Sequence, residues 1–71
     1  MDKTYTYEIR VEGHLSEHWS DWFGGLQIHN EPGGETVLRG SFVDQPALFG
    51  TLTRIQALNL TLISVNRCFR T

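Results

Sequence analysis

The densest aromatic segment of the chain is Ser16-Glu17-His18-Trp19-Ser20-Asp21-Trp22-Phe23-Gly24-Gly25. It holds both tryptophans and one of the four phenylalanines. Side chains of this size either complete a small hydrophobic core or form a contact surface. Because a small domain needs such rings for burial, we expect Trp19, Trp22 and Phe23 to lie mainly in the core, with part of the cluster open to a partner chain.

Signals for a short helix or turn bound this segment. Ser16 is a typical N-cap residue, because its hydroxyl can accept a hydrogen bond from a free amide of the first turn. Trp19, Trp22 and Phe23 follow at i, i+3 and i+4, a spacing that places the three rings on one face. Gly24-Gly25 ends the element, since glycine readily adopts the left-handed conformation that follows a helix.

On both sides of this segment the chain has features typical of strands. Before it, apolar and polar residues alternate over residues 4–12, which predicts a strand with one buried face. The apolar face carries Tyr5, Tyr7, Ile9 and Val11. After it, residues 26–30 and 35–43 predict a hairpin around the turn Glu31-Pro32-Gly33-Gly34. Gly40 indicates a bulge or a close backbone approach in the second of these strands.

A long amphipathic helix is predicted after the hairpin. Asp44 is placed to cap it, and Pro46 lies in the first turn, where a missing N–H does no harm. The apolar stripe consists of Leu48, Leu52, Ile55 and Leu58. We expect Phe49 to widen this stripe. Gly50 costs about 1 kcal/mol relative to alanine inside a helix, and we expect close packing of the helix on the sheet to be the reason.

The end of the helix and the last strand are predicted from residues 59–67. Asn59 can take the left-handed cap position, with Leu60 folding back as its hydrophobic contact. Residues 61–67 predict a strand with Ile63 and Val65 on one face and Leu62 on the other. Apolar residues on both faces favour a central or well-covered strand.

Together these elements predict a single α+β domain over residues 1–71. The order is strand, short helix, strand, strand, long helix, strand, which favours one four-stranded, mostly antiparallel sheet with the long helix on one face. The tryptophan segment would close an edge or an end of the sheet. Two strand orders stay open, because the last strand can follow a right-handed crossover from the third strand or pair with the first.

Composition and charge exclude several classes of protein. A formal net charge of −2 gives no general attraction to nucleic acid or to anionic lipid. The chain has no apolar run near the roughly 20 residues that span a bilayer, and its start has no signal-peptide pattern. Cys68 is the single cysteine, so we expect no internal disulfide and a reducing cytoplasm.

Histidines near the aromatic segment offer a candidate metal site. His14-Leu15-Ser16-Glu17-His18 has the H-x-x-E-H pattern of inverted zinc peptidases. The helix start at Ser16 falls after His14, so the two imidazoles would not share a helical face, and the chain is too short for a peptidase cleft. A simpler site would use His14 and His18 with Asp21 or His29. The competing interpretation is that these are solvated side chains.

Two further patterns are weighed against plain structural roles. Cys68 lacks any feature that would activate a nucleophilic thiol. A sheet that binds single-stranded nucleic acid would use arginines and stacking rings. The chain has these in Arg10, Arg39, Arg67, Tyr5, Tyr7 and Phe42. The acidic net charge and the interleaved Glu8 and Glu12 favour cross-strand ion pairs instead, so we do not expect nucleic-acid binding.

The chain also resembles a family of small, uncharacterised bacterial proteins. The resemblance is carried by Trp19-Ser20-Asp21-Trp22-Phe23-Gly24-Gly25-Leu26, Gly33-Gly34-Glu35-Thr36-Val37-Leu38, Asp44-Gln45-Pro46-Ala47-Leu48-Phe49-Gly50-Thr51-Leu52-Thr53-Arg54-Ile55 and Leu60-Thr61-Leu62-Ile63-Ser64-Val65-Asn66-Arg67. These segments cover most of the chain. The resemblance implies a stand-alone bacterial protein and supplies no catalytic residues.

We therefore expect a cytoplasmic, non-catalytic module that works by self-association and binding. A homodimer would compensate for the small core and cover an exposed sheet face or edge. We expect the binding or interface residues to be Trp19, Asp21, Trp22 and Phe23, with another protein or a small ligand as partner and with no cofactor. The alternative is a small dimeric metal-dependent enzyme or metal-binding protein that uses the segment from His14 to Asp21.

Overall fold

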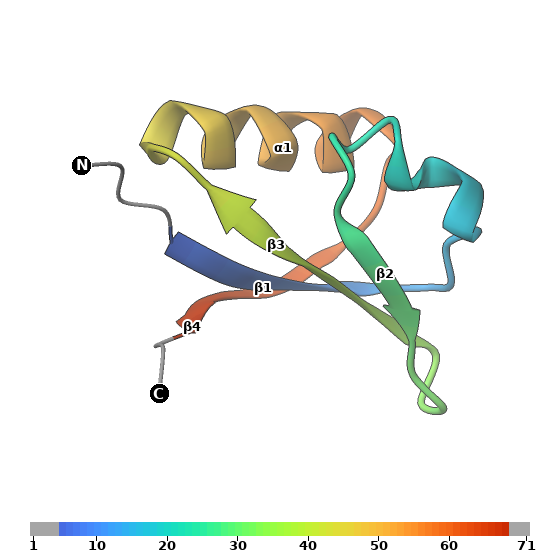
Figure 1. Cartoon of the computed structure of the whole chain (residues 1–71). Coiled ribbons are helices and arrows are strands. Elements are labelled where there is room, and N and C mark those ends of the chain that lie inside the picture. The colour runs from blue at the N-terminus through green and yellow to red at the C-terminus, as the bar shows by residue number, and fades with distance from the viewer. Residues whose placement is uncertain (1–4, 69–71) are drawn as a thin grey trace.

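The computed structural model describes residues 5–68. These residues form a four-stranded antiparallel sheet with one α-helix packed across its face (Figure 1). The elements are β1 (Tyr5–Glu12), the 3-10 helix η1 (Glu17–Ser20), β2 (Gln27–Asn30), β3 (Glu35–Phe42), α1 (Gln45–Ala57) and β4 (Leu62–Cys68). The strand order is β2-β3-β1-β4. The predicted α+β class and element order are confirmed, and the last strand pairs with the first.

β1 forms the centre of the sheet, because it pairs with β3 on one side and β4 on the other. Ile9 lies opposite Leu38 of β3 and Val65 of β4. The predicted alternation is confirmed for Tyr7, Ile9 and Val11, which are buried in the core, whereas Tyr5 at the start of the strand is exposed. Pairing on both sides and burial on one face explain why β1 organises the rest of the fold.

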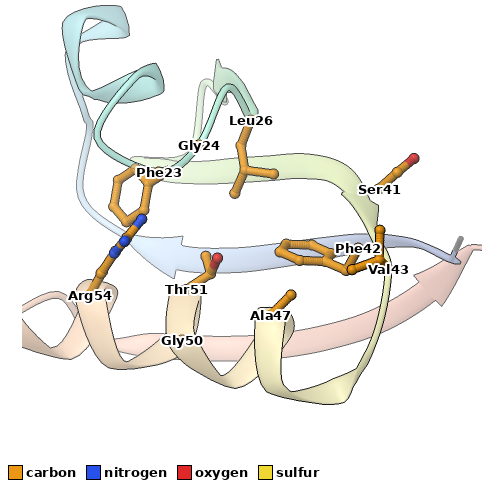
Figure 2. A pocket seen from close by; sticks show the side chains of 10 residues that line it. All are labelled: Phe23, Gly24, Leu26, Ser41, Phe42, Val43, Ala47, Gly50, Thr51 and Arg54. Atoms are coloured by element: carbon orange, nitrogen blue, oxygen red, sulfur yellow. The ribbon is translucent and has the colours of Figure 1, made fainter.

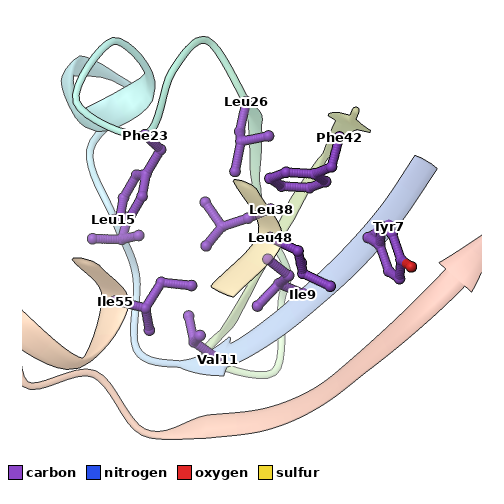
Figure 3. Close-up of a cluster of buried hydrophobic side chains, with 10 residues drawn as sticks. All are labelled: Tyr7, Ile9, Val11, Leu15, Phe23, Leu26, Leu38, Phe42, Leu48 and Ile55. Atoms are coloured by element: carbon purple, nitrogen blue, oxygen red, sulfur yellow. The ribbon is translucent and has the colours of Figure 1, made fainter. Parts of the chain in front are cut away.

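The core lies between α1 and the sheet (Figure 3). Its members are Tyr7, Ile9, Val11, Leu15, Phe23, Leu26, Leu38, Phe42, Leu48 and Ile55. The helix begins as predicted, because the Asp44 carboxylate accepts a hydrogen bond from the Ala47 amide at 2.9 Å. It ends as predicted too. Asn59 has a φ of 62° and Leu60 donates back to the Ile55 carbonyl at 3.3 Å, which satisfies the last helical carbonyls.

Two expectations for α1 are wrong. Phe49 does not widen the buried stripe, because its side chain is 58% exposed. The buried face of the helix carries Leu48, Thr51 and Ile55, and successive helical residues are about 100° apart, so Phe49 turns away from the sheet. Gly50 does not mark close packing on the sheet either, since a β-carbon at this position would have no atom within 4 Å.

The expectation of a covered last strand is also wrong. β4 lies at the edge of the sheet, with Leu62 47% and Ile63 41% exposed. The register shifts at Arg10 and Val11, so that Ile63 has no partner on β1. The shift places Leu62 opposite Val11 while Val65 stays opposite Ile9, so Leu62 and Val65 lie on the same side of the sheet and the simple alternation on which the expectation depended does not hold.

The only α-helix within residues 5–68 is α1, and no helix there is long and apolar enough to cross a membrane.

Candidate functional site

The aromatic segment leaves β1 and forms η1 and a glycine turn. The Ser16 hydroxyl accepts a hydrogen bond from the His18 amide at 3.2 Å, which confirms Ser16 as the N-cap. The chain then turns through Gly24 and Gly25, whose φ angles of 81° and 89° favour glycine. The Gly25 amide closes this turn by donating to the Ser20 carbonyl at 2.8 Å.

The three rings of the segment stack edge to face in a row. The Trp19 and Trp22 rings are 5.7 Å apart and the Trp22 and Phe23 rings are 5.0 Å apart, centre to centre. Phe23 is only 2% exposed, whereas Trp19 and Trp22 are 37% and 39% exposed. The row therefore runs from the core to the surface. The expectation of a mainly buried cluster is confirmed for Phe23 and is wrong for Trp19 and Trp22. Asp21 is exposed at the end of η1, and its backbone carbonyl accepts from Gly24 at 3.0 Å.

A polar network holds the start of the segment against the hairpin. The Asn30 amide accepts from the Leu15 backbone at 3.0 Å and donates back to it at 2.9 Å. The Thr36 hydroxyl is fully buried, 2.5 Å from the Gly13 carbonyl oxygen and 2.7 Å from Asn30 Oδ1. Because buried polar groups are costly unless paired, this network fixes the path of the chain between β1 and η1.

Arg54 of α1 ties the far end of the segment to the helix. Its Nη1 donates to the Trp22 carbonyl oxygen at 3.0 Å. The guanidinium carbon also lies 5.9 Å from the centre of the Trp22 ring, close enough for a cation–π interaction. Both contacts join residues that are 32 positions apart in the chain.

A groove of about 400 Å³ opens between this segment, the end of β3 and α1 (Figure 2). It is lined by Phe23, Gly24, Leu26, Ser41, Phe42, Val43, Ala47, Gly50, Thr51 and Arg54. Most of these residues are apolar or small, and Arg54 is the one charged residue among them. The aromatic segment thus forms one wall of the groove. This groove was not predicted from the sequence.

The histidines proposed as metal ligands lie at the start of the segment. The Nε2 atom of His14 is 3.0 Å from the Glu31 carbonyl oxygen, and His18 is exposed on η1. His29 lies in β2, with Nε2 3.7 Å from the carboxylate of the same Glu31. Within residues 5–68 no three or more His, Cys, Asp or Glu side chains are grouped so that they could hold a metal ion.

The face of the sheet opposite α1 carries ion pairs between strands, as predicted. Arg10 Nη1 lies 2.6 Å from the Glu31 carboxylate and 3.0 Å from the Glu35 carboxylate, and Arg39 pairs with Glu8 at 3.1 Å. The hydrogen bond from Arg10 lowers the pKa of Glu31 below its ordinary value of 4.5, and the positive charge of Arg10 acts in the same direction.

Arg67, the third arginine that a nucleic-acid-binding sheet would have used, does not lie on this face. It lies opposite Tyr7, a residue of the helix-facing side, and its guanidinium carbon is 4.9 Å from the centre of the Tyr5 ring. Residues that lie directly opposite each other in an antiparallel pair point to the same face, so Arg67 lies on the helix-facing side with Tyr7. Cys68, the next residue, is partly buried and lies opposite Thr6.

A second apolar surface, which sequence reasoning missed, lies along the β4 edge. A groove of about 470 Å³ runs between α1 and the start of β4. It is lined by Phe49, Leu52, Thr53, Ile55, Gln56, Leu60 and Leu62. Phe49, Leu62 and Ile63 are the exposed apolar residues beside this edge, and we call them the edge patch. The only sequence signal for it was the pair of adjacent apolar residues, Leu62 and Ile63, at the start of β4.

Comparison with known proteins gives one relationship. No curated protein and no solved structure matches the chain. Residues 6–66 match the family described as a Domain of unknown function (DUF8691), and this span runs from β1 into β4. Because the match extends over most of the chain, the protein belongs to this family.

Proposed function

We propose that the protein is a non-catalytic interaction module that works as a homodimer, in which the β4 strands of two copies pair edge to edge. The observation that carries this proposal is the outer edge of β4. Within residues 5–68 this strand has a neighbour on one side only, and it carries no charged residue from Leu62 to Asn66. An open strand of this kind presents free N–H and C=O groups that a second strand can satisfy.

The two edges of the sheet differ in a way that favours β4. β2 spans Gln27–Asn30 and is followed by Glu31 and Pro32, so it is short and flanked by residues that discourage pairing. β4 spans Leu62–Cys68 and contains no proline. Natural sheets protect the edges that must not pair. β2 is protected by its shortness and by Glu31 and Pro32, whereas β4 has only the irregularity at Ile63 and one charged residue, Arg67, near its end.

The composition of β4 also suits a second copy of the same chain. A two-fold axis brings identical surfaces together, so any charge near the centre of the interface would face its own copy. The stretch from Leu62 to Asn66 is free of charge, and antiparallel pairing of two such stretches places no like charges opposite each other. The edge patch would lie beside the paired strands, where its apolar side chains could be buried.

The small size of the domain supports the same proposal. A chain of 71 residues without an internal disulfide buries only a modest core. A partner chain is a common source of the missing stability in domains of this size. We further propose a bacterial origin, on the resemblance of the sequence, and a cytoplasmic location, on the single cysteine.

The test is the mass of the protein in solution. Light scattering after size exclusion, with native mass spectrometry, should give the mass of two chains at micromolar concentration. Ile63→Lys should give one chain, because two lysines would meet near the two-fold axis. Ile63 has no partner on β1 and is exposed, so the variant should keep the circular dichroism of the wild type.

Val43→Lys is the matched control. Val43 is also an exposed apolar residue, at 66%, but it follows β3, and β1 lies between β3 and β4. This variant should stay a dimer. A wild type that remains a single chain, or an Ile63→Lys variant that remains a dimer, would refute pairing through β4.

A further inference from the structure

We propose that the groove beside the aromatic segment binds a small molecule with an apolar body and one carboxylate. The apolar body would lie over Gly50 of α1, and the carboxylate would be held by Arg54. This inference goes beyond the self-association proposed above and does not depend on it, because the groove lies between α1, β3 and the aromatic segment, away from β4.

The first observation that supports a ligand site is the glycine at position 50. It lies inside α1, where glycine is unfavourable, and it has ordinary helical geometry that any residue could adopt. A β-carbon at position 50 would meet no atom within 4 Å, so nothing in the described fold requires a glycine there. A glycine is useful where the backbone must be approached closely by a ligand. The bare helix surface at Gly50 forms part of the groove (Figure 2).

The walls of the groove give the chemistry of the ligand body. Phe23, Leu26 and Phe42 line it and belong to the buried core, so their positions are fixed by packing. The volume of about 400 Å³ falls within the range of small-molecule sites, about 300–1,000 Å³. Apolar walls that are already ordered bind an apolar body without a large cost in conformational entropy.

Arg54 gives the polar end. It is the one charged residue of the lining, and within residues 5–68 no carboxylate forms an ion pair with it. One of its five N–H donors is used on the Trp22 carbonyl, which orients the guanidinium and leaves the others for a ligand. A planar guanidinium pairs with a carboxylate through two parallel hydrogen bonds, so a carboxylate is the anion that this position favours.

The test is a titration of the isotope-labelled protein with octanoate, followed by NMR. Octanoate should shift the amide signals of the groove, that of Gly50 among them, in a saturable way. Methyl octanoate, which has the same chain but no charge, should bind at least about tenfold more weakly. Absence of saturable shifts, shifts confined to residues outside the groove, or equal affinity for the two compounds would overturn the proposal.

Two variants separate the roles of shape and charge. Gly50→Leu fills the space above the helix and should weaken octanoate binding at least about tenfold, since a methyl-rich side chain would occupy the site of the ligand. Arg54→Met keeps the apolar stem and should abolish the preference for octanoate over its methyl ester, whereas Arg54→Lys should restore part of it. Unchanged binding in Gly50→Leu would overturn the assignment of the site.

Thr53→Leu and Ile63→Lys are the controls. Thr53 is exposed and lines the groove beside β4 instead of this one, so the same added leucine should leave octanoate affinity within about twofold of wild type. Ile63→Lys should bind octanoate like the wild type whatever its mass, which keeps the ligand site and the dimer separately testable. Loss of binding in Thr53→Leu would show that the effect of Gly50→Leu is not local.

Discussion

The side chain of Leu26 lies on Gly40, in the space that a β-carbon at position 40 would need. Leu26 precedes β2 and Gly40 lies in β3, so this contact seats the end of the aromatic segment on the sheet. Leu26 is buried and belongs to the core. Gly40 was predicted to mark a bulge or a close backbone approach. It does mark a close approach, but the group that lies against it is the side chain of Leu26.

Gly40→Ala should destabilise the protein by about 1–3 kcal/mol, the usual cost of adding a methyl group to a packed core. Urea unfolding followed by circular dichroism measures the change. In a Leu26→Ala background the same substitution should cost clearly less, because the clashing side chain is gone. Equal costs in the two backgrounds would show that the contact between these two residues is not the cause.

Gly50→Ala should stabilise the protein, in contrast to Gly40→Ala. The added methyl group meets no atom within 4 Å, so the variant gains helix propensity without strain. We expect the free energy of unfolding to rise by about 1 kcal/mol. The same urea experiment tests it, and a fall in stability would mean that the backbone at position 50 is more crowded than the structure describes.

Phe23 and Trp19 should differ sharply in their contribution to stability, although both belong to one row of rings. Phe23→Ala should cost about 3–5 kcal/mol, because the ring is buried and leaves a cavity. Trp19→Ala should cost only about 1–2 kcal/mol, since it removes one edge-to-face contact and a partly exposed surface. Thermal unfolding of the two variants compares them directly, and similar losses would contradict the gradient of burial.

The ion pair between Arg10 and Glu31 should make stability depend on acid pH. The fold lowers the pKa of Glu31, so its contribution is fully present above the ordinary value of 4.5 and is lost as the pH falls through the lower value in the folded protein. Glu31→Gln should therefore be less stable than wild type at about pH 7, and the difference should shrink by about pH 3.

Urea unfolding at the two pH values measures this difference. Glu17→Gln is the control, because Glu17 is an exposed carboxylate that forms no ion pair among the described residues. A difference between wild type and Glu31→Gln that stays constant with pH would exclude Glu31 as the titrating group.

Local patterns predicted most of the fold, because they depend on neighbours in the sequence. The alternation in β1, the caps at Ser16 and Asp44 and the left-handed Asn59 all lie where expected. The exposure of Phe49 was not predicted. The sequence of a helix indicates which residues form its apolar face, but it does not indicate how much of that face the sheet covers.

The candidate site was predicted only in part, because only some of its residues are close to one another in the sequence. Trp19, Trp22 and Phe23 were recognised as neighbours because they are close in sequence, and the structure places them in one row. Arg54 was missed, since its contact with Trp22 joins segments that only the tertiary fold brings together. The glycine inside α1 was the one sequence signal for the groove, and it was interpreted as packing against the sheet.

The strand order β2-β3-β1-β4 sets a limit on assembly. Two copies joined through β4 would form one continuous eight-stranded sheet, and both of its outer edges would be β2. These are the short strands flanked by Glu31 and Pro32, which resist further pairing. Growth would therefore stop at two copies and would not continue into a fibre, because the more open edge of each chain, β4, is already paired in the dimer.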